Sequence, residues 1–221
     1  MGLFNMLERV RNQNPQYYQL NTKDIRAVIL AGGRGKRLLP LTDQNPKVIL
    51  EVAGKPVINY IIDNLNNNGI KIICASLLYK PEKILPLIEK RISYDIQKID
   101  MGTAGALKRI STWLSDPFIV CNGDTVSNIN IAKLLKGHEL MNSKATVFTH
   151  QDEFDNGGTY IFSKSVLNYI PDDVPFMIND LFKALNKVPP SVTLSFQDEL
   201  YWDIGTPKGL RRAQIFYEKL N

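Results

Sequence analysis

Apolar runs alternate with segments of helical periodicity over the first two thirds of the chain. The run "IRAVILAGG" (25–33) is short, β-branched and ended by glycines, as is typical of a buried strand. The segment 56–70 starts at a proline, has apolar residues three and four positions apart and ends near a glycine, which predicts a helix. Further strands are predicted at 71–79, 94–99 and 117–124, and further helices at 81–92, 104–114 and 131–141. This alternation implies parallel strands with right-handed crossovers, so we predict an α/β fold with a doubly wound, mostly parallel, Rossmann-like sheet.

The pattern changes after residue 144. Strand pairs are predicted there, 145–150 with 159–164 and then 181–185 and 191–196, before a closing helix at 207–220. We expect this mixed α+β C-terminal part to cover the far edge of the sheet. Because no linker-like composition or internal repeat interrupts the chain, we predict a single domain at 25–221, preceded by an N-terminal extension at 1–24.

Composition and charge exclude several classes of protein. Of the 221 residues 44% are apolar and 22% charged, and no apolar run approaches the ~18 residues of a membrane span. The first residues do not have the features of a signal peptide, and both cysteines, Cys74 and Cys121, lie in apolar runs. We therefore expect a cytoplasmic protein with buried free thiols and no membrane partner. The net charge of +5 forms no basic stripe, so we expect no nucleic-acid partner.

The glycine-rich stretch "AGGRGKR" (31–37) follows the first predicted strand directly. Ligands of open parallel sheets bind beyond the carboxyl ends of the strands, where bare backbone N–H groups can face an anion. A P-loop would need a hydroxyl residue where this chain has Arg37, and a dinucleotide fingerprint would need a third glycine where it has Leu38. The remaining alternatives are an uncommon phosphate site or a glycine-rich turn with solvated basic residues.

Four ordered motifs favour the phosphate site. The first is the order of residues after the glycines, namely Arg37, Pro40, Thr42, Pro46, Lys47, Gly54, Lys55 and Pro56. It resembles the start of the sugar-1-phosphate nucleotidyltransferases, also called nucleoside-diphosphate-sugar pyrophosphorylases. The stretch "MGTAGALKRI" (101–110) is similar to the loop of this family against base and ribose, and "VCNGDT" (120–125) and "YWDIGTPKGL" (201–210) are similar to its two metal-binding loops. The resemblance runs from Ile25 to the end and is greatest to the small heptose and mannose 1-phosphate guanylyltransferases.

The resemblance implies an enzyme that joins a nucleoside triphosphate to a sugar 1-phosphate. A sugar-phosphate oxygen attacks the α-phosphorus, pyrophosphate leaves, and an NDP-sugar is formed, which suggests a role in surface polysaccharide synthesis. Such a reaction depends on Mg²⁺ and fixed cations more than on acid–base groups. We expect Mg²⁺ as the cofactor, held by Asp124 and Asp203, because Mg²⁺ often uses only one or two carboxylates plus substrate phosphates.

The resemblance also assigns roles to individual residues. The catalytic set is Arg37, whose planar fork suits the β- and γ-phosphates, Lys47, which bridges the α-phosphate and the sugar phosphate, and Asp124. The expected nucleotide-binding residues are Leu30, Ala31, Gly32, Gly33, Gly35, Lys36, Gly102, Thr103 and Gly105. The expected sugar-binding residues are Asn122, Asn156 and Gly157. An Asn-Gly hairpin turn is an equally simple interpretation of Asn156 and Gly157.

Three departures from the family pattern leave alternatives open. Lys36 stands where the family often has Thr, and Val48 where it often has Pro. The short connection after His150 contains no lysine up to Thr159, although longer relatives hold the sugar phosphate with a lysine there. A cytidylyltransferase acting on a non-sugar phosphate and an inactive nucleotide-binding module are therefore retained as alternatives. GTP is favoured, with UTP, CTP and dTTP open, and a homo-oligomer is neither required nor excluded.

Overall fold

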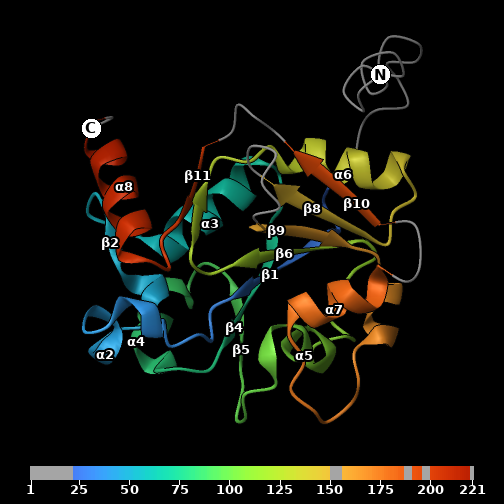
Figure 1. The fold of residues 1–221 in the computed structure, drawn as a ribbon, viewed down its shortest axis with the longest axis horizontal. Coiled ribbons are helices and arrows are strands. Elements are labelled where there is room, and N and C mark those ends of the chain that lie inside the picture. Colours follow the sequence, from blue (N-terminus) through green and yellow to red (C-terminus); the bar gives the residue numbers. More distant parts are fainter. Residues whose placement is uncertain (1–21, 150–155, 187–190, 196–199, 220–221) are drawn as a thin grey trace.

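The computed structural model describes residues 22–149, 156–186, 191–195 and 200–219. Its centre is a seven-stranded sheet in the order β10-β8-β9-β6-β1-β4-β5 (Figure 1). The strands are β1 (Arg26–Leu30), β4 (Ile72–Leu77), β5 (Ser93–Ile96), β6 (Phe118–Asn122), β8 (Ala145–Thr149), β9 (Asn156–Phe162) and β10 (Ser191–Ser195). All pairings are parallel except those of β9 with β6 and β8, so β9 alone runs against the others. The predicted doubly wound, mostly parallel α/β sheet is confirmed.

Strand β1, which lies between β6 and β4 in the sheet, is buried on both faces. Ala27 and Ile29 belong to one apolar cluster, while Val28 and Leu30 belong to a second cluster on the other face. The first face is covered by α3 (Val57–Asn67), α4 (Pro81–Ile88) and α6 (Ile131–Leu140), and the second by α5 (Gly102–Arg109), η4 (Lys164–Tyr169) and α7 (Ile178–Leu185). Burial on both faces explains why β1 is an unbroken apolar run and not an alternating one.

The C-terminal part extends the sheet and does not only cover its edge. The predicted pair 145–150 and 159–164 corresponds to β8 and β9, which are antiparallel. The segment 181–185, expected among the strand pairs, is instead the end of helix α7. Ile178, Leu181 and Leu185 are buried in the second cluster, and their spacing of three and four places them on one face of a helix.

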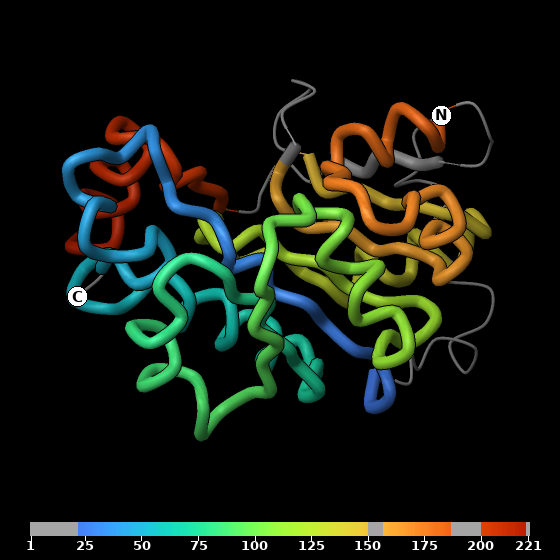
Figure 2. Tube along the Cα trace, turned by 90° about the horizontal axis from the view of Figure 1, so that it is seen from below, coloured from blue at the N-terminus to red at the C-terminus, as the bar shows by residue number. Residues whose placement is uncertain are grey.

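Two small antiparallel pairs lie outside the main sheet. Strands β2 (Glu51–Val52) and β3 (Lys55–Pro56) form a hairpin, and β7 (Thr125–Ser127) pairs with β11 (Tyr201–Asp203). After β11 the chain forms α8 (Pro207–Glu218), which packs against β2 (Figure 2). The amide oxygen of Gln214 on α8 accepts a hydrogen bond from the Ala53 N–H at 2.8 Å. The C-terminal helix thus ties the β2–β3 hairpin to β11.

Both cysteines are free and buried, as predicted. Burial raises the pKa of the Cys74 thiol to about 11 and that of Cys121 to about 12. Neither thiol is therefore ionised near neutral pH, which argues against a nucleophilic role. None of the helices in the described part of the chain has the length and apolar character needed to cross a membrane.

Candidate active site

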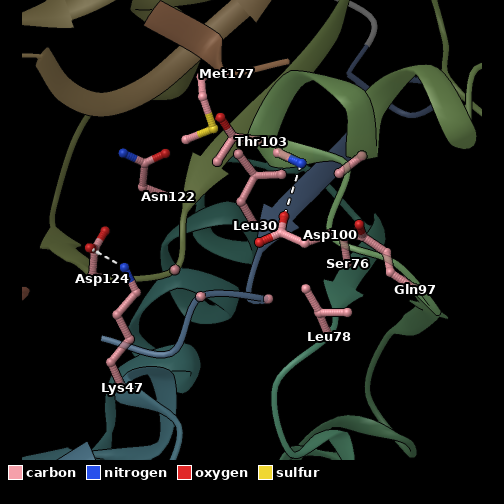
Figure 3. A pocket seen from close by; sticks show the side chains of 15 residues that line it. Leu30, Lys47, Ser76, Leu78, Gln97, Asp100, Thr103, Asn122, Asp124 and Met177 are labelled. Carbon is pink, nitrogen blue, oxygen red and sulfur yellow. Dashed lines mark hydrogen bonds and ion pairs between the residues drawn. The ribbon is translucent and has the colours of Figure 1, made fainter. Parts of the chain in front are cut away.

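A pocket of about 240 Å³ opens at the carboxyl ends of β1, β4 and β6. Leu30 comes from β1, Ser76 from β4 and Asn122 from β6, and the N-terminal turn of α5 adds Thr103. Figure 3 shows these side chains around a common space. This is the edge of a parallel sheet at which ligands bind, as the position of the glycine-rich stretch predicted.

The glycine loop after β1 encloses the side chain of Lys47. Gly35 has φ 75°, a left-handed conformation that glycine adopts at low cost, and the Thr42 hydroxyl donates to its carbonyl oxygen at 2.7 Å. A Cβ at Gly35 would lie 3.0 Å from Lys47 Cβ, and one at Gly33 would lie 3.3 Å from Lys47 Cε. Larger residues would displace the lysine stem. The loop therefore guides the Lys47 ammonium towards Asp124, with which it forms an ion pair (Figure 3).

Strand pairing brings Asp203 beside Asp124. Asp203 ends β11, and β11 pairs with β7, which begins directly after Asp124. A Cβ placed at Gly205 would lie 2.8 Å from Asp203 Oδ1 and 2.9 Å from both Asp124 Oδ2 and Arg37 Nη2. Two carboxylates and a guanidinium thus converge on one point, although their residues lie far apart in the sequence.

The four charges of this cluster balance one another. We call Arg37, Lys47, Asp124 and Asp203 the charged end of the site. The side chains of Lys47 and Asp124 are 17% and 12% exposed, whereas Arg37, 3.8 Å from Asp203, is 64% exposed. Burial raises the pKa of Asp203, and the charge of Asp124 adds to this, while the Gly205 N–H hydrogen bond and the two basic side chains oppose it. Placing the negative charge of Asp203 beside that of Asp124 therefore costs free energy.

The opposite side of the pocket is polar but uncharged where it is buried. Gln97 Nε2 donates to Ser76 Oγ at 2.8 Å, and Gln97 Oε1 is buried without a hydrogen-bond partner in the described part of the chain. Asp100, nearer the opening, accepts the Gly102 N–H at 3.0 Å. Figure 3 shows Gln97 and Ser76 across the pocket from the Lys47–Asp124 pair. We call this side of the pocket, formed by Ser76, Gln97 and Asp100, the base end. Since a buried polar atom without a partner is destabilising, the base end suits a ligand that forms hydrogen bonds with it.

The structure gathers most of the residues predicted from the sequence. The pocket is lined by Leu30, Gly32, Gly33, Lys47, Gly102, Thr103, Asn122 and Asp124. Gly35 adjoins the stem of Lys47, and Arg37 and Asp203 complete the charged end.

Other predicted residues lie away from the pocket lining. Ala31 is fully buried beneath the glycine loop, and Lys36 is exposed on it. Gly105 faces Met101 and the 174–176 segment on another side of α5. Asn156 and Gly157 begin β9, with Asn156 opposite Thr149, so they do not form the turn of the hairpin. A Cβ at Gly157 would collide with the Phe148 ring, which gives this glycine a packing role.

Several residues of the pocket were not predicted from the sequence. They are Ser76, Leu78, Gln97, Asp100, Ala106, Gly123 and Met177. Ser76 left one signal, because it is the single polar residue in the otherwise apolar run 72–78, whereas the run 94–99 around Gln97 also contains Asp95 and Lys98. That signal marks a polar group near a core but gives no partner for it.

The charged end fits a hard divalent cation that is shared with a ligand. No group of three or more His, Cys, Asp or Glu side chains in the described residues is placed to hold a metal by itself. Asp124 and Asp203 nevertheless face one point, and Mg²⁺ is often held by one or two carboxylates together with phosphate oxygens. The donors present therefore suit Mg²⁺ bound with a phosphorylated substrate.

The fold and the pocket together define a class. A Rossmann-like sheet that presents a glycine loop, paired cations and carboxylates at its carboxyl edge is typical of nucleotide-binding α/β proteins. Residues 26–156, more than half of the chain, match the family described as nucleotidyl transferase, and the chain belongs to this family.

Individual relatives carry guanylyltransferase names. The chain is 27% identical to the D-glycero-α-D-manno-heptose 1-phosphate guanylyltransferase of Campylobacter jejuni, with 83% of the chain and 96% of the relative covered. It is also 27% identical to the mannose-1-phosphate guanylyltransferase of Mycobacterium tuberculosis, with 87% of the chain covered but 64% of the relative. The chain thus spans somewhat less than two thirds of the length of the mannose-type relatives.

Solved structures share the fold. HddC from Yersinia pseudotuberculosis, complexed with GMP-PN, is 25% identical with a TM-score of 0.71, covering 87% of this chain and 99% of that one. A structure from Bacillus anthracis, in complex with a sucrose, is 20% identical with a TM-score of 0.77, covering 89% and 96%. The sheet and its helices are therefore those of known nucleotidyltransferase-type chains.

Proposed function

We propose that this chain transfers a nucleoside monophosphate, with GTP as the favoured donor, to a sugar 1-phosphate. The observation that carries the proposal is the convergence of Arg37, Lys47, Asp124 and Asp203 at one end of a pocket with a hydrogen-bonding base end. A triphosphate spanning this pocket would place its base near Gln97 and its phosphates near Lys47. The names of the heptose and mannose relatives support a sugar 1-phosphate acceptor.

The reaction balances without a proton donor. An oxygen of the sugar phosphate, already ionised, forms a new bond to the α-phosphorus. The bond from the α-phosphorus to the bridging oxygen breaks, and pyrophosphate leaves with the electron pair. The products are an NDP-sugar and pyrophosphate. The protein must therefore neutralise and align two anions, which electrostatics and positioning accomplish.

We assign each residue of the charged end a separate role in this reaction. Lys47, whose side chain is nearly buried, is a compact cation suited to the α-phosphate and the incoming phosphate. Arg37 is exposed and planar, which suits two oxygens of the leaving pyrophosphate. Mg²⁺, when bound by Asp124 and Asp203, would supply further positive charge to the phosphate oxygens.

The polar groups of the base end are an argument for GTP as the donor nucleotide. Guanine offers two adjacent hydrogen-bond donors, N1–H and the N2 amino group, on its pairing edge. Gln97 Oε1 is a buried acceptor without a partner in the described residues, and the Asp100 carboxylate lines the same pocket. Uracil and thymine offer one such donor. The pocket therefore favours guanine, in agreement with the names of its relatives.

The acceptor side is less defined. Asn122 lines the pocket, and its Nδ2 lies 3.5 Å from the hydroxyl of Tyr160. We propose it as a donor to a sugar hydroxyl, with Asn156 as a second candidate. We also propose a role in polysaccharide synthesis, which the resemblance to the family supports, and a cytoplasmic location, with which the two free, buried thiols agree.

The test is pyrophosphate release with GTP, UTP, CTP and dTTP crossed against mannose, glucose, N-acetylhexosamine and heptose 1-phosphates and a phosphorylated alcohol as a non-sugar acceptor, with and without Mg²⁺. The proposal predicts release with one pair of substrates, GTP being the best donor, and no release without Mg²⁺. Release only with a non-sugar phosphate and CTP would favour a cytidylyltransferase. Nucleotide binding without release under any condition would indicate an inactive module.

A further inference from the structure

The Lys47 ammonium lies where a metal ion would compete for Asp124. Lys47 Nζ contacts Asp124 Oδ2, the same oxygen that faces the common point near Gly205. Asp203 Oδ1 accepts the Gly205 N–H at 2.8 Å, and Arg37 lies 3.8 Å from Asp203 Oδ2. Asp124 Oδ2 and both carboxylate oxygens of Asp203 therefore already have a proton donor or a positive charge beside them.

The charge balance makes this arrangement unfavourable for a free cation. Two carboxylates and two basic side chains give the cluster no net charge, and Mg²⁺ gives up its water ligands reluctantly. A free metal ion would have to displace Lys47 from a pair whose members are less than a fifth exposed. Separating such a pair leaves a poorly solvated charge, which costs free energy unless another partner is supplied.

A triphosphate supplies that partner. Its oxygens attract the Lys47 ammonium and release Asp124 Oδ2, and the metal then binds both the carboxylates and the phosphates. Lys47 is suited to this exchange because its charge is compact and its stem is flexible, while Gly33 and Gly35 leave room along the stem. Val48, the next residue, is fully buried against Gly123 and anchors the chain on which the lysine moves.

We propose that Lys47 closes the metal site in the nucleotide-free protein and moves to the phosphates when a triphosphate binds. The metal and the triphosphate then bind with positive coupling, and each raises the affinity for the other by the same factor. Lys47 is a catalytic cation and also an internal substitute for the metal. This inference rests on the proposed function, since it requires a triphosphate at the charged end.

The first experiment is a Mn²⁺ titration of nucleotide-free protein, monitored by calorimetry and by Mn²⁺ electron paramagnetic resonance. Lys47→Met keeps the length of the stem and removes the charge, so Mn²⁺ should bind at least about 5-fold more tightly than to wild type. Lys36→Met is the matched control, because it removes a charge from the exposed part of the same loop; we expect a change of less than 2-fold, roughly the level of long-range screened charge effects. Equal affinities of wild type and Lys47→Met would overturn the proposal.

The second experiment uses wild type, and remains decisive if Lys47→Met does not fold. Mn²⁺ is titrated with and without α,β-methylene GTP, in which the bond that would break is replaced by a P–C bond. The proposal predicts at least about 5-fold tighter Mn²⁺ binding with the analogue. An unchanged Mn²⁺ affinity, with the analogue bound, would overturn it. Failure of the analogue to bind at any Mn²⁺ concentration would instead overturn the proposed function.

A third pair of variants separates the exchange from simple charge repulsion. Asp124→Asn and Asp203→Asn each remove one negative charge, but only the first frees Lys47. Without metal, the analogue should bind more tightly to Asp124→Asn than to Asp203→Asn. Equal gains would show that Lys47 is not held by Asp124, and the proposal would fail.

Discussion

The two ends of the pocket differ in how their residues are held and in what they can do. At the charged end, Asp124 from the turn after β6 and Asp203 from β11 face Lys47 and Arg37, the opposite charges neutralise one another, and each already has a partner. At the base end, Gln97 Oε1 is buried and has no partner in the described residues. The first arrangement can exchange a charged partner for a ligand, whereas the second offers a ligand an unpaired hydrogen-bond acceptor. We therefore expect the charged end to set the rate with every nucleotide and the base end to choose among nucleotides.

Asp124→Asn should have the largest effect. It removes a predicted metal ligand and the partner of Lys47, so kcat should fall on the order of 10³-fold, the scale of several kcal/mol of transition-state stabilisation. Steady-state pyrophosphate release with saturating substrates measures this. Asp172→Asn, at a side chain that is 79% exposed, is the control and should retain wild-type rates. Substantial turnover by Asp124→Asn would contradict the division into two ends.

Arg37→Met should come next. The exposed guanidinium holds no part of the core, so the fold should be unaffected, while loss of its contact with the leaving pyrophosphate should lower kcat/KM by about 10²-fold. Arg34→Met is a matched control, because Arg34 lies on the same loop but pairs with Asp43 at 3.3 Å. Similar losses in both variants would mean that the loop attracts phosphates only through its overall charge.

Gln97→Leu should change selectivity and not the rate of the chemical step. Loss of one hydrogen bond to the base should lower kcat/KM for GTP by roughly 10-fold, with a smaller change for the pyrimidine nucleotides. Competition assays with mixed nucleotides would detect the altered ratio. Gln44→Leu, on the exposed α2 (Leu41–Gln44), serves as a control for the change in residue type.

The smallest effect on catalysis is expected from His138, which affects stability far from the pocket. His138 is 4% exposed, and its ring contacts Thr146 Oγ1 at 2.9 Å and Ser163 Oγ at 3.2 Å. Burial lowers the pKa of His138 from 6.5 to about 4, and the charge of Asp116 opposes this only in part. The unfolded chain therefore binds more protons between these values, and stability should fall as pH drops from 6.5 towards 4.

Denaturant unfolding at several pH values checks this expectation. The free energy of unfolding should decline by roughly 2 kcal/mol between pH 7 and pH 4.5 through His138. His138→Gln should show a flatter profile over this range while nucleotide selectivity stays unchanged. An identical slope in both proteins would show that other groups govern the acid response.

The residues of the charged end could be predicted from the sequence, whereas those of the base end could not. Arg37, Lys47, Asp124 and Asp203 were predicted because each lies in a recognisable motif, and the motifs follow one another in order. Ser76 and Gln97 were not, because their contact depends on the parallel register of β4 and β5, in which Leu77 lies opposite Ile96. Periodicity indicates that a strand exists but does not give its neighbours.

The fold, too, could be predicted only where it depends on local sequence patterns. The order of the main-sheet strands and their crossover helices up to α6 followed from apolar patterning, because both sheet faces are buried there. The antiparallel position of β9 and the pairing of β7 with β11 depend on contacts between distant segments. The apolar residues at 181, 182 and 185 alone do not predict helix α7, because Ile178 is needed to complete the helical spacing.

The most direct test of the account is the kcat/KM profile over GTP, UTP, CTP and dTTP for wild type, Asp124→Asn and Gln97→Leu, with one productive sugar 1-phosphate. The account predicts that Asp124→Asn lowers all four values by a similar factor, whereas Gln97→Leu changes their ratios. The contrary result, a change of ratios in Asp124→Asn with a uniform loss in Gln97→Leu, would contradict the separation of charge chemistry from base selection.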